Sequence, residues 1–285
     1  MRHIIVGAVA YAPQIVPIWD IIREYANAYF KDIRLDYVLF SNYERQVQWL
    51  MEKKIDIAWN TNVAYIRSQV ASDNAMEAIL MRDTDIGFQS VFVTRENGVK
   101  DLQDLQGKKF GLGSLDSAQA AIMPLHFLQD SALTLQEMSS LSESAPSNAV
   151  GIYRFNSDVG KHGDTGRSEF DVLDKIRSGE LDAGAIGSST WARILQEGSY
   201  AGIKSFYVGA EYCHCNFTLS KDFDKGLRDA FVEMMLSQNA RKSDSKIAHM
   251  MSLEGLNEWI LCDEKALKGY EIIFEAMKKQ NLLFA

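Results

Sequence analysis

The chain has 285 residues, of which 38 are acidic and 30 are basic, so its formal net charge is −8. Apolar residues make up 47% of it and charged residues 24%, which fits a soluble globular protein and excludes collagen, coiled coil and wholesale disorder. The acidic balance argues against nucleic acid or an anionic membrane as the main partner. No apolar run approaches the roughly 20 residues of a spanning helix, so we expect no membrane insertion.

The amino terminus and the cysteines bear on the cellular compartment. Residues 4–7 lead directly into a first strand, without the longer apolar core and small-residue cleavage site of a secretory leader. The sequence as written therefore predicts a cytoplasmic protein, or a periplasmic one if a leader has been removed before Met1. Cys213 and Cys215 are two residues apart and Cys262 makes the count odd, so reduced thiols are expected.

The first half of the chain alternates strand and helix patterns. Apolar runs predict strands at 4–9, 33–39, 55–59, 78–81 and 91–94. Apolar residues recur at helical spacing over 15–29, and Ser41 with Glu44 forms the capping-box pattern of a second helix. Residues 60–62 are predicted to cap the helix behind the third strand. This alternation predicts an α/β sheet with helices on both faces.

The second half repeats the alternation. Strands are predicted at 108–112, 183–186, 205–208 and 216–219. Residues 114–117 are predicted to lead into a helix that runs through Leu128. Further helices are predicted around 172–176, from 188 onward, and near 222–236, 244–252 and 263–280. The polar stretch 130–170 carries the weakest secondary-structure pattern of the chain.

Three strings carry a resemblance to a known family. They are IDIAWN at 55–60, DLQDLQGKK at 101–109 and SGELDAGA at 178–185. Together with the order of elements, they resemble the type II periplasmic binding proteins, and within them the phosphate/phosphonate-binding components of ABC transporters. The second string is the most telling, because this pattern leads into the second lobe in many such proteins. The likeness covers nearly the whole chain.

The resemblance implies a two-lobed α/β fold with a two-strand hinge and a ligand cleft between the lobes, at the carboxyl ends of the strands. Lobe one is expected at 1–90 plus 210–285, and lobe two at 91–209. The implied function is that of a solute-binding protein that closes around a small polar molecule, zwitterionic or anionic, for ABC-type transport or sensing. The implied partners are this small molecule and an ABC permease, and we expect a monomer or a weak dimer.

The ligand loop of this family shows a departure in this chain. In phosphonate-binding relatives, Ser and Thr hydroxyls and backbone N–H groups at a helix N-terminus hold the oxyanion. The corresponding loop here is GSLDSAQ at 113–119, in which Asp116 adds a carboxylate between Ser114 and Ser117. That carboxylate would repel a phosphonate, and Asp164 is expected to face it. We therefore expect a zwitterionic or amine-bearing solute; an ordinary N-cap role for Ser114 or Asp116 is an equal alternative.

The segment EYCHCN at 211–216 combines two thiols with an imidazole. On an extended backbone Cys213 and Cys215 point to one side and His214 to the other. These groups are soft ligands for zinc, iron or copper, although a straight strand does not present all three to one ion. Buried, inert thiols beside a polar histidine are the alternative. A metal ion at this segment is the only cofactor that the sequence suggests, and Tyr212, Cys213 and His214 are expected to contact the ligand.

Other ligand-binding candidates follow from the topology. Tyr11, Asn60, Thr61 and Ser188 each follow or end a predicted strand, where the N–H groups of the next helix converge. The string KHGDTGRS at 161–168 lacks the Gly-Lys-Ser/Thr ending of a phosphate loop. It offers His162 and Asp164 as donor and acceptor for a polar ligand, with a solvated loop as an equal alternative.

A second hypothesis is a cytoplasmic enzyme on the same fold, such as a decarboxylase, a dehydratase or a cofactor-precursor synthase. Its support is the missing leader, the Cys-His-Cys segment, and the acid/base candidates His162, Asp164 and His214. A fold is shared by binding proteins and enzymes alike, so the fold does not separate the two hypotheses. Binding proteins are more numerous than enzymes in the family that the chain resembles, which favours the first hypothesis, a solute-binding protein.

Overall fold

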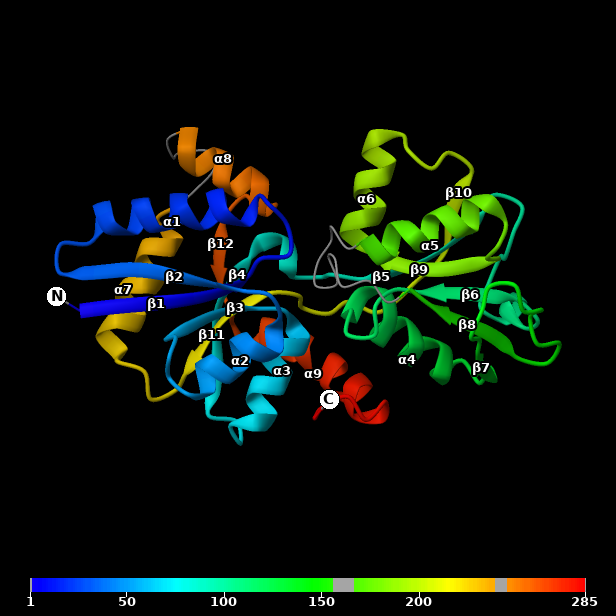
Figure 1. Ribbon diagram of the computed structural model, residues 1–285, viewed down its shortest axis with the longest axis horizontal. Helices are drawn as coiled ribbons and strands as arrows, with labels where there is room; N and C mark the ends of the chain where they lie inside the picture. Colours follow the sequence, from blue (N-terminus) through cyan, green and yellow to red (C-terminus); the bar gives the residue numbers. More distant parts are fainter. Residues whose placement is uncertain (1, 156–166, 239–244, 285) are drawn as a thin grey trace. The chain divides into compact units, whose positions relative to one another are not determined.

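The computed structural model describes residues 2–155, 167–238 and 245–284 (Figure 1). They divide into two compact units. The first unit comprises Met1–Gly87, Cys213–Phe274 and Leu283–Ala285, and the second comprises Phe88–Tyr212 and Glu275–Leu282. The segment 275–282, which the predicted ranges placed in lobe one, therefore belongs to the second unit.

The first unit contains a six-stranded sheet in the order β12-β4-β11-β3-β1-β2. Its strands are β1 (Arg2–Val9), β2 (Ile33–Phe40), β3 (Ile57–Asn60), β4 (Met76–Arg82), β11 (Asn216–Ser220) and β12 (Trp259–Leu261). β1 pairs in parallel with β2 and β3, whereas β11 lies antiparallel between β3 and β4. β3 and β4 therefore run in the same direction. The short edge strand β12 was not predicted.

Helices cover both faces of this sheet. They are α1 (Ile15–Tyr29), α2 (Tyr43–Met51), α3 (Asn62–Ala71), α7 (Lys225–Leu236), α8 (Ser245–Glu254) and most of α9 (Glu264–Lys279), with a 3₁₀ turn η1 (Asp83–Asp85). Successive residues of β1 point to opposite faces: Ile4 and Val6 pack with α1 and α8, and Val9 packs with α2 and α3. Figure 1 shows α1 and α8 on one face and α2 and α3 on the other.

The helix starts in the first unit agree only in part with the predicted caps. Thr61, within the predicted capping residues 60–62, accepts a hydrogen bond from the Ala64 N–H at 3.3 Å and caps α3. The cap of α2 is Asn42, whose Oδ1 accepts from the Arg45 N–H at 2.9 Å. The predicted capping box placed the N-cap of this helix at Ser41, one residue too early. Asn42 has the extended backbone that an N-cap needs.

The second unit contains a separate six-stranded sheet in the order β10-β5-β9-β6-β8-β7. Its strands are β5 (Ser90–Arg95), β6 (Lys109–Leu112), β7 (Leu135–Glu137), β8 (Val150–Arg154), β9 (Ala183–Gly187) and β10 (Ile203–Val208). β6, β7, β8 and β9 are parallel, and β5 is antiparallel to its neighbours β9 and β10. β7 and β8 lie in the polar stretch where the sequence pattern was weakest.

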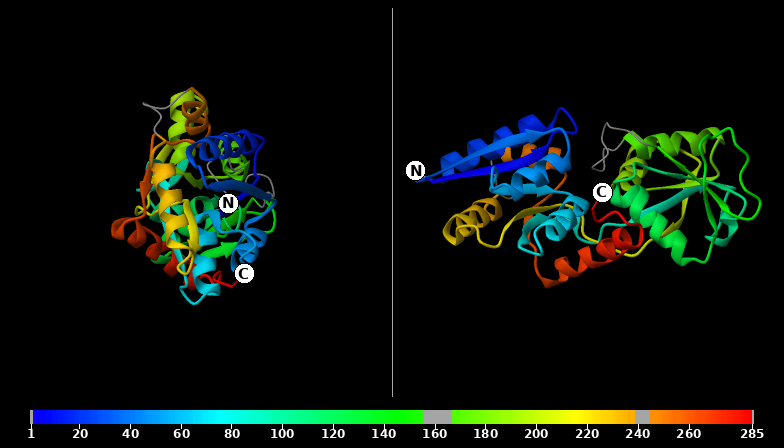
Figure 2. Two further views of the ribbon diagram at one scale, coloured as in Figure 1. Left: turned by 90° about the vertical axis from the view of Figure 1, so that its left-hand side faces the viewer. Right: turned by 60° about the horizontal axis from the view of Figure 1, so that its bottom comes forward.

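The helices of the second unit also lie on both faces of its sheet. They are α4 (Met123–Asp130), α5 (Arg167–Ser178) and α6 (Ser188–Glu197), with a 3₁₀ turn η2 (Gln103–Leu105) and a π-helical turn η3 (Ala118–Ile122) that runs directly into α4. α5 and α6 cover one face, where Val172 and Ile194 pack on Val91 and Ile186. α4 lies on the other face (Figures 1 and 2). The helix predicted behind residues 114–117 thus begins at Ala118, and its cap is Ser117 rather than Ser114 or Asp116.

Two sheets with helices on both faces confirm the predicted α/β class. In the part of the chain that the structure describes, no helix is both long enough and apolar enough to cross a bilayer.

Phe217 on β11 is the aromatic centre of the first unit's core. Its ring centroid lies 4.7 Å from that of Trp59 and 5.3 Å from those of Phe231 and Trp259. The side chain is fully buried. Each of these rings comes from a different element, so Phe217 joins β3, α7 and β12 to the middle of the sheet.

We expect Phe217→Ala to lower the free energy of unfolding by about 3–5 kcal/mol, since it removes a large buried ring and leaves a cavity. Urea denaturation followed by circular dichroism measures the change. Phe284→Ala is the matched control, because Phe284 is 87% exposed and its removal should change stability by less than about 0.5 kcal/mol. Equal effects of the two substitutions would contradict this account of the core.

Candidate functional site

Several strands of the first unit share one edge of the sheet. The parallel strands β3 and β4 end there at Asn60 and Arg82, and the antiparallel strand β11 begins there, since Asn216 pairs with Asn60. The predicted ligand residues Asn60 and Thr61 and the segment 213–215 therefore meet at this carboxyl edge. Tyr11 follows β1, which runs parallel to β3, and is partly buried.

Asn60 and Thr61 have partners inside the first unit. The Asn60 Oδ1 accepts from the Gln46 amide at 2.8 Å, and its Nδ2 donates to the Thr218 hydroxyl at 3.0 Å. Thr61 caps α3, as described above. Both side chains are buried. These hydrogen bonds fix the end of β3, and the contact of Tyr11, Asn60 and Thr61 with a ligand stays a prediction.

A buried ion pair lies at the same edge. The Arg82 Nε and Nη2 each donate to one oxygen of Asp85 at 2.7 Å, and Nη1 donates to the Glu254 carbonyl at 2.7 Å. Arg82 is 8% exposed and Asp85 is fully buried. Burial by itself would raise the pKa of Asp85, but the charge of Arg82 and its hydrogen bonds outweigh burial and hold that pKa well below its ordinary value.

The Cys-His-Cys segment passes beside this ion pair. The His214 Nδ1 lies 3.5 Å from Asp85 Oδ1 and 3.1 Å from Cys215 Sγ, and ligand atoms of these three buried residues all lie within 4.8 Å of one another. Within the described ranges, this group contains His214 and Cys215 of the predicted metal ligands, together with Asp85. The two N–H groups of Arg82 already hold the carboxylate, and their charge would repel a cation there.

Cys213 stands apart from that group. Its backbone N–H donates to the Gly269 carbonyl, and its carbonyl accepts from the Asn62 amide, each at 3.0 Å. Burial raises the pKa of the Cys213 thiol to about 12, so the thiol is neutral at physiological pH. Metal binding by Cys213, His214 and Cys215 stays a prediction.

The loop behind β6 forms the carboxyl edge of the second unit's sheet. The Ser117 hydroxyl caps the following helix by accepting from the Ala120 N–H at 3.2 Å. The Ser114 hydroxyl donates to the Phe155 carbonyl at 3.4 Å, and the Gly113 N–H donates to the Ala120 carbonyl at 2.8 Å. Ser114 and Ser117 are buried, whereas Asp116 is partly exposed.

This loop brings the start of a helix close to the end of a strand. A Cβ at Gly113 would lie 2.7 Å from Ala120 Cβ, so only glycine permits the approach. The helix runs from Ala118 through η3 and α4 to Asp130, and its first N–H groups have no partner within the helix itself. A helix start of this kind attracts an oxyanion through its N–H groups and its dipole.

Glu169 is a buried residue of this edge that sequence reasoning missed. It lies in the first turn of α5 and is 1% exposed. Its Oε2 accepts from the Gly187 N–H at 2.8 Å, and its Oε1 accepts from the Gln119 amide at 3.1 Å. The neighbouring Ser168 hydroxyl accepts from the Ser114 N–H at 3.3 Å. The start of α5 therefore joins the loop behind β6 to the end of β9.

Ser188 and Tyr212 lie close to these groups in the second unit. The Ser188 N–H donates to the Gln89 carbonyl at 2.9 Å, and its hydroxyl accepts from the Gln89 N–H at 3.2 Å. The Tyr212 hydroxyl lies 3.2 Å from the Ser90 hydroxyl. Burial, with a smaller contribution from the charge of Glu169, raises the pKa of Tyr212 far above its ordinary value, so the phenol stays protonated.

The structure thus brings Ser114, Ser117 and Ser188 to one edge of the second unit, with Tyr212 within electrostatic reach of Glu169. His162 and Asp164 lie outside the described residues. The ligand contacts of all these residues stay predictions.

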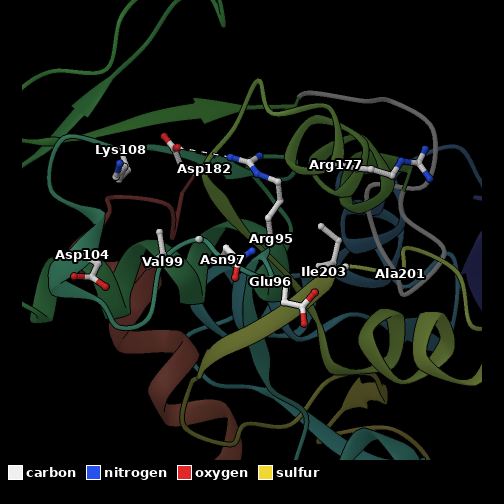
Figure 3. A pocket seen from close by; sticks show the side chains of 12 residues that line it. Arg95, Glu96, Asn97, Val99, Asp104, Lys108, Arg177, Asp182, Ala201 and Ile203 are labelled. Carbon is white, nitrogen blue, oxygen red and sulfur yellow. Dashed lines mark ion pairs between the residues drawn. The ribbon is translucent and has the colours of Figure 1, made fainter.

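A pocket of about 780 Å³ lies at the opposite edge of the second sheet, where β5 ends and β10 begins (Figure 3). Its charged lining is mixed: Arg95, Lys108, Arg177, Glu96, Asp104 and Asp182. In Figure 3 Arg95 reaches toward Asp182, and their ion pair measures 3.9 Å. Arg95 also donates to the Leu181 carbonyl at 2.8 Å, so it stabilises the turn into β9. The predicted ligand residues that the structure describes do not line this pocket.

The ion pair of the first unit gives a testable expectation. We expect Asp85→Asn to lower the free energy of unfolding at pH 7 by roughly 3–5 kcal/mol, because the buried Arg82 loses the carboxylate that accepts from both its Nε and Nη2 and keeps only the Glu254 carboxylate, 3.5 Å from Nη1. The folded-state pKa of Asp85 lies below the unfolded value of 3.8, so the stabilisation is complete above that pH and is lost as the pH falls below it. The difference between wild type and variant should therefore shrink in acid.

Urea denaturation at pH 7 and at stepwise lower pH measures both effects. Glu197→Gln is the control, because Glu197 forms an exposed pair with Arg193 at 2.8 Å and its removal should leave the free energy of unfolding almost unchanged. A difference between wild type and Asp85→Asn that grows in acid would contradict the assignment.

Comparisons with solved structures show the same fold over nearly the whole chain. A structure of XAC2383 from Xanthomonas citri bound to ATP has a TM-score of 0.77 at 12% identity and covers 99% of this chain and 98% of that one. A structure of PhnD1 from Prochlorococcus marinus (MIT 9301) in complex with methylphosphonate has a TM-score of 0.71 at 19% identity and covers 99% of each chain. These likenesses confirm the predicted two-lobed type II periplasmic-binding-protein fold.

Sequence comparisons give the family. A probable ABC-transporter phosphite-binding protein, PhnD1 of Prochlorococcus marinus (strain MIT 9301), is 22% identical over 259 residues, covering 87% of this chain and 80% of that relative. The model of the family described as "ABC transporter, phosphonate, periplasmic substrate-binding protein" matches residues 10–259. The chain therefore belongs to the phosphonate family of ABC-transporter periplasmic substrate-binding proteins.

Proposed function

We propose that this protein captures a small polar solute that carries an oxyanion, either anionic or zwitterionic, and delivers it to the permease of an ABC transporter. The observation that carries the proposal is the loop behind β6, in which Ser117 caps a helix that starts against the end of a strand. The family supports the same ligand chemistry, as does the methylphosphonate bound to PhnD1.

The loop suits an oxyanion because its donors are fixed before the ligand arrives. The Ser117 hydroxyl satisfies the Ala120 N–H, and the Gly113 N–H is bonded to the Ala120 carbonyl. The N–H of Ala118, the first residue of the helix, is then the group that a bound oxyanion would engage. A hydrogen bond to a charged partner contributes about 1.5–3 kcal/mol.

The family also supports a periplasmic location for this protein, where it would meet its solute before transport. The enzyme hypothesis gains no comparable support. Of its acid/base candidates, His214 is buried in the first unit beside Asp85. A buried imidazole with these neighbours contributes to the ion-pair cluster, and solute binding remains the function that the site favours.

Ala118→Pro tests the loop without removing a side chain that folds it. Proline at the first residue of a helix removes one N–H group and otherwise suits the helix, and the preceding Ser117 already has the extended backbone that proline requires. We expect the affinity for phosphite or methylphosphonate, measured by isothermal titration calorimetry, to fall about tenfold or more.

Lys225→Pro is the matched control, since Lys225 is the exposed first residue of α7 behind the capping residue Asp224. It should leave affinity unchanged. Thermal unfolding of both variants checks that the fold persists. Unchanged binding by the Ala118→Pro variant, or no binding of any phosphite, phosphonate or amino acid to the wild type at millimolar concentration, would reject the proposal.

A further inference from the structure

The strand β2 forms one border of the first unit's sheet. Among the residues that the structure describes, it pairs with β1 on one side and is the last strand on the other. The Asp32 and Phe40 carbonyls accept from the N–H groups of Arg2 and Ala10 on the β1 side, at 3.0 and 2.9 Å. Because backbone groups alternate along a strand, the odd-numbered residues, Leu35 among them, turn their N–H and C=O groups to the outer edge. An edge of this kind can pair with a strand of another chain.

Asn27 of α1 occupies the middle of this outer edge. Its Nδ2 donates to the Leu35 carbonyl at 3.0 Å, and its Oδ1 accepts from the Leu35 N–H at 2.9 Å. One side chain therefore makes both of the hydrogen bonds that a residue of an added strand would make. The next outward N–H, that of Tyr37, donates to the Asp36 Oδ1 at 2.9 Å.

The helix α1 holds Asn27 in this position through two further contacts with β2. Asp20, Arg23 and Asn27 recur at helical spacing, so they lie on one stripe of the helix. The Tyr37 hydroxyl donates to the Asp20 Oδ1 at 2.8 Å, and the Arg23 Nη1 lies 3.7 Å from the Asp36 Oδ1. The stripe thus meets β2 in reverse order, and Figure 1 shows α1 beside this strand.

The edge is open to solvent beside the Asn27 contact. A surface hollow of about 510 Å³ lies there, lined by Arg23, Glu24, Asn27, Ala28, Arg34, Leu35 and Asp36. The side chains of Arg34 and Asp36 are exposed, whereas Leu35 is buried. A strand from outside could therefore approach this edge, and the Asn27 side chain is what already holds the groups at its centre.

The sequence of β2 is complementary to itself at this centre. If two copies of β2 paired antiparallel about Leu35, the two Leu35 residues would exchange both of their outward hydrogen bonds. Arg34 of each copy would then lie directly opposite the partner's Asp36, in the closely spaced pairs that flank a hydrogen-bonded pair. Opposite charges at such positions stabilise a pair of strands, and like charges destabilise it.

We infer that the outer edge of β2 is a pairing surface for a second copy of this chain, and that Asn27 keeps it closed. While the Asn27 contact is intact, the first unit's sheet ends at β2. Once the contact is lost, two copies can join through an isologous interface into one continuous sheet. The inference concerns self-association alone and does not depend on the proposed function.

Asn27→Ala tests the inference, because it removes both hydrogen bonds to Leu35. Sedimentation velocity should show a monomeric wild type up to about 100 µM and a concentration-dependent dimer of the variant. At a dilution where both are monomers, amide exchange of Leu35 followed by NMR should be about tenfold faster in the variant, since its N–H has lost its acceptor.

Charge reversal in the Asn27→Ala background tests the register of the dimer. Asp36→Arg places Arg34 opposite an arginine, and Arg34→Asp places Asp36 opposite an aspartate, so each should abolish the dimer. The two reversals together should restore it. Non-specific aggregation of a destabilised variant would not show this reciprocal pattern. Asn97→Ala is the control, because Asn97 is an exposed asparagine of the second unit, and it should remain monomeric.

Three results would overturn the inference. A folded Asn27→Ala variant that stays monomeric shows that the edge does not pair with a second copy. A dimer that persists through each single charge reversal rejects the register. A wild-type Leu35 amide that exchanges as fast as that of Leu39, which faces the same edge beyond Tyr37, shows that Asn27 does not close the edge. This last measurement decides the point even if Asn27→Ala does not fold.

Discussion

The hydrogen bonds at the start of α5 hold the carboxyl edge of the second unit together. Ser168 receives the Ser114 N–H, and Glu169 receives the Gly187 N–H and the Gln119 amide. These bonds reach the loop behind β6, the helix that it opens and the turn behind β9. The parallel pairing of β6 with β9 brings those segments to one edge, and the absence of a Cβ at Gly113 and Gly187 lets them approach closely.

Three carboxylates are buried in the described residues, and two of them, Asp85 and Glu169, have different kinds of partner. Asp85 has a guanidinium on both oxygens, and this partner lowers its pKa although burial opposes the charge. Glu169 has a backbone N–H and a side-chain amide, which orient the group. The first arrangement stabilises the end of a strand. The second joins the start of α5 to the start of the helix behind β6.

Much of the fold could be predicted because strands and helices follow local patterns. Apolar runs predicted the central strands, and Thr61, within the predicted capping residues 60–62, is the cap of α3. Residues 114–117 were predicted to lead into a helix, but its cap is Ser117 and not Ser114 or Asp116. Other strands could not be predicted, because their segments have too little apolar periodicity. These are β7 and β8, which lie in a polar stretch, and β12, which has only three residues. Serine and asparagine both cap helices well, so the residue types alone do not show whether Ser41 or Asn42 caps α2. The backbone conformation determines that it is Asn42.

The candidate site was predictable at the level of loops and not of individual contacts. Ser114, Ser117 and Ser188 follow directly from the rule that ligands bind at strand ends. Glu169 could not be found in this way, because an acidic residue in a first helical turn usually faces solvent and only complements the helix dipole. Its burial results from tertiary contacts with Gln119 and Gly187, which lie 50 and 18 residues away in the chain.

The π-helical turn η3 has a consequence for how such a site can change over evolution. The Ser117 carbonyl accepts from both the Ala121 and the Ile122 N–H groups, so this turn holds one residue more than an α-helical turn can. Deletion of one residue here would leave a regular helix that still begins behind Ser117. The deletion would rotate the early turn against α4 and carry Gln119 away from Glu169. A single-codon length change would thus rearrange the contacts at this edge while every charged residue is kept.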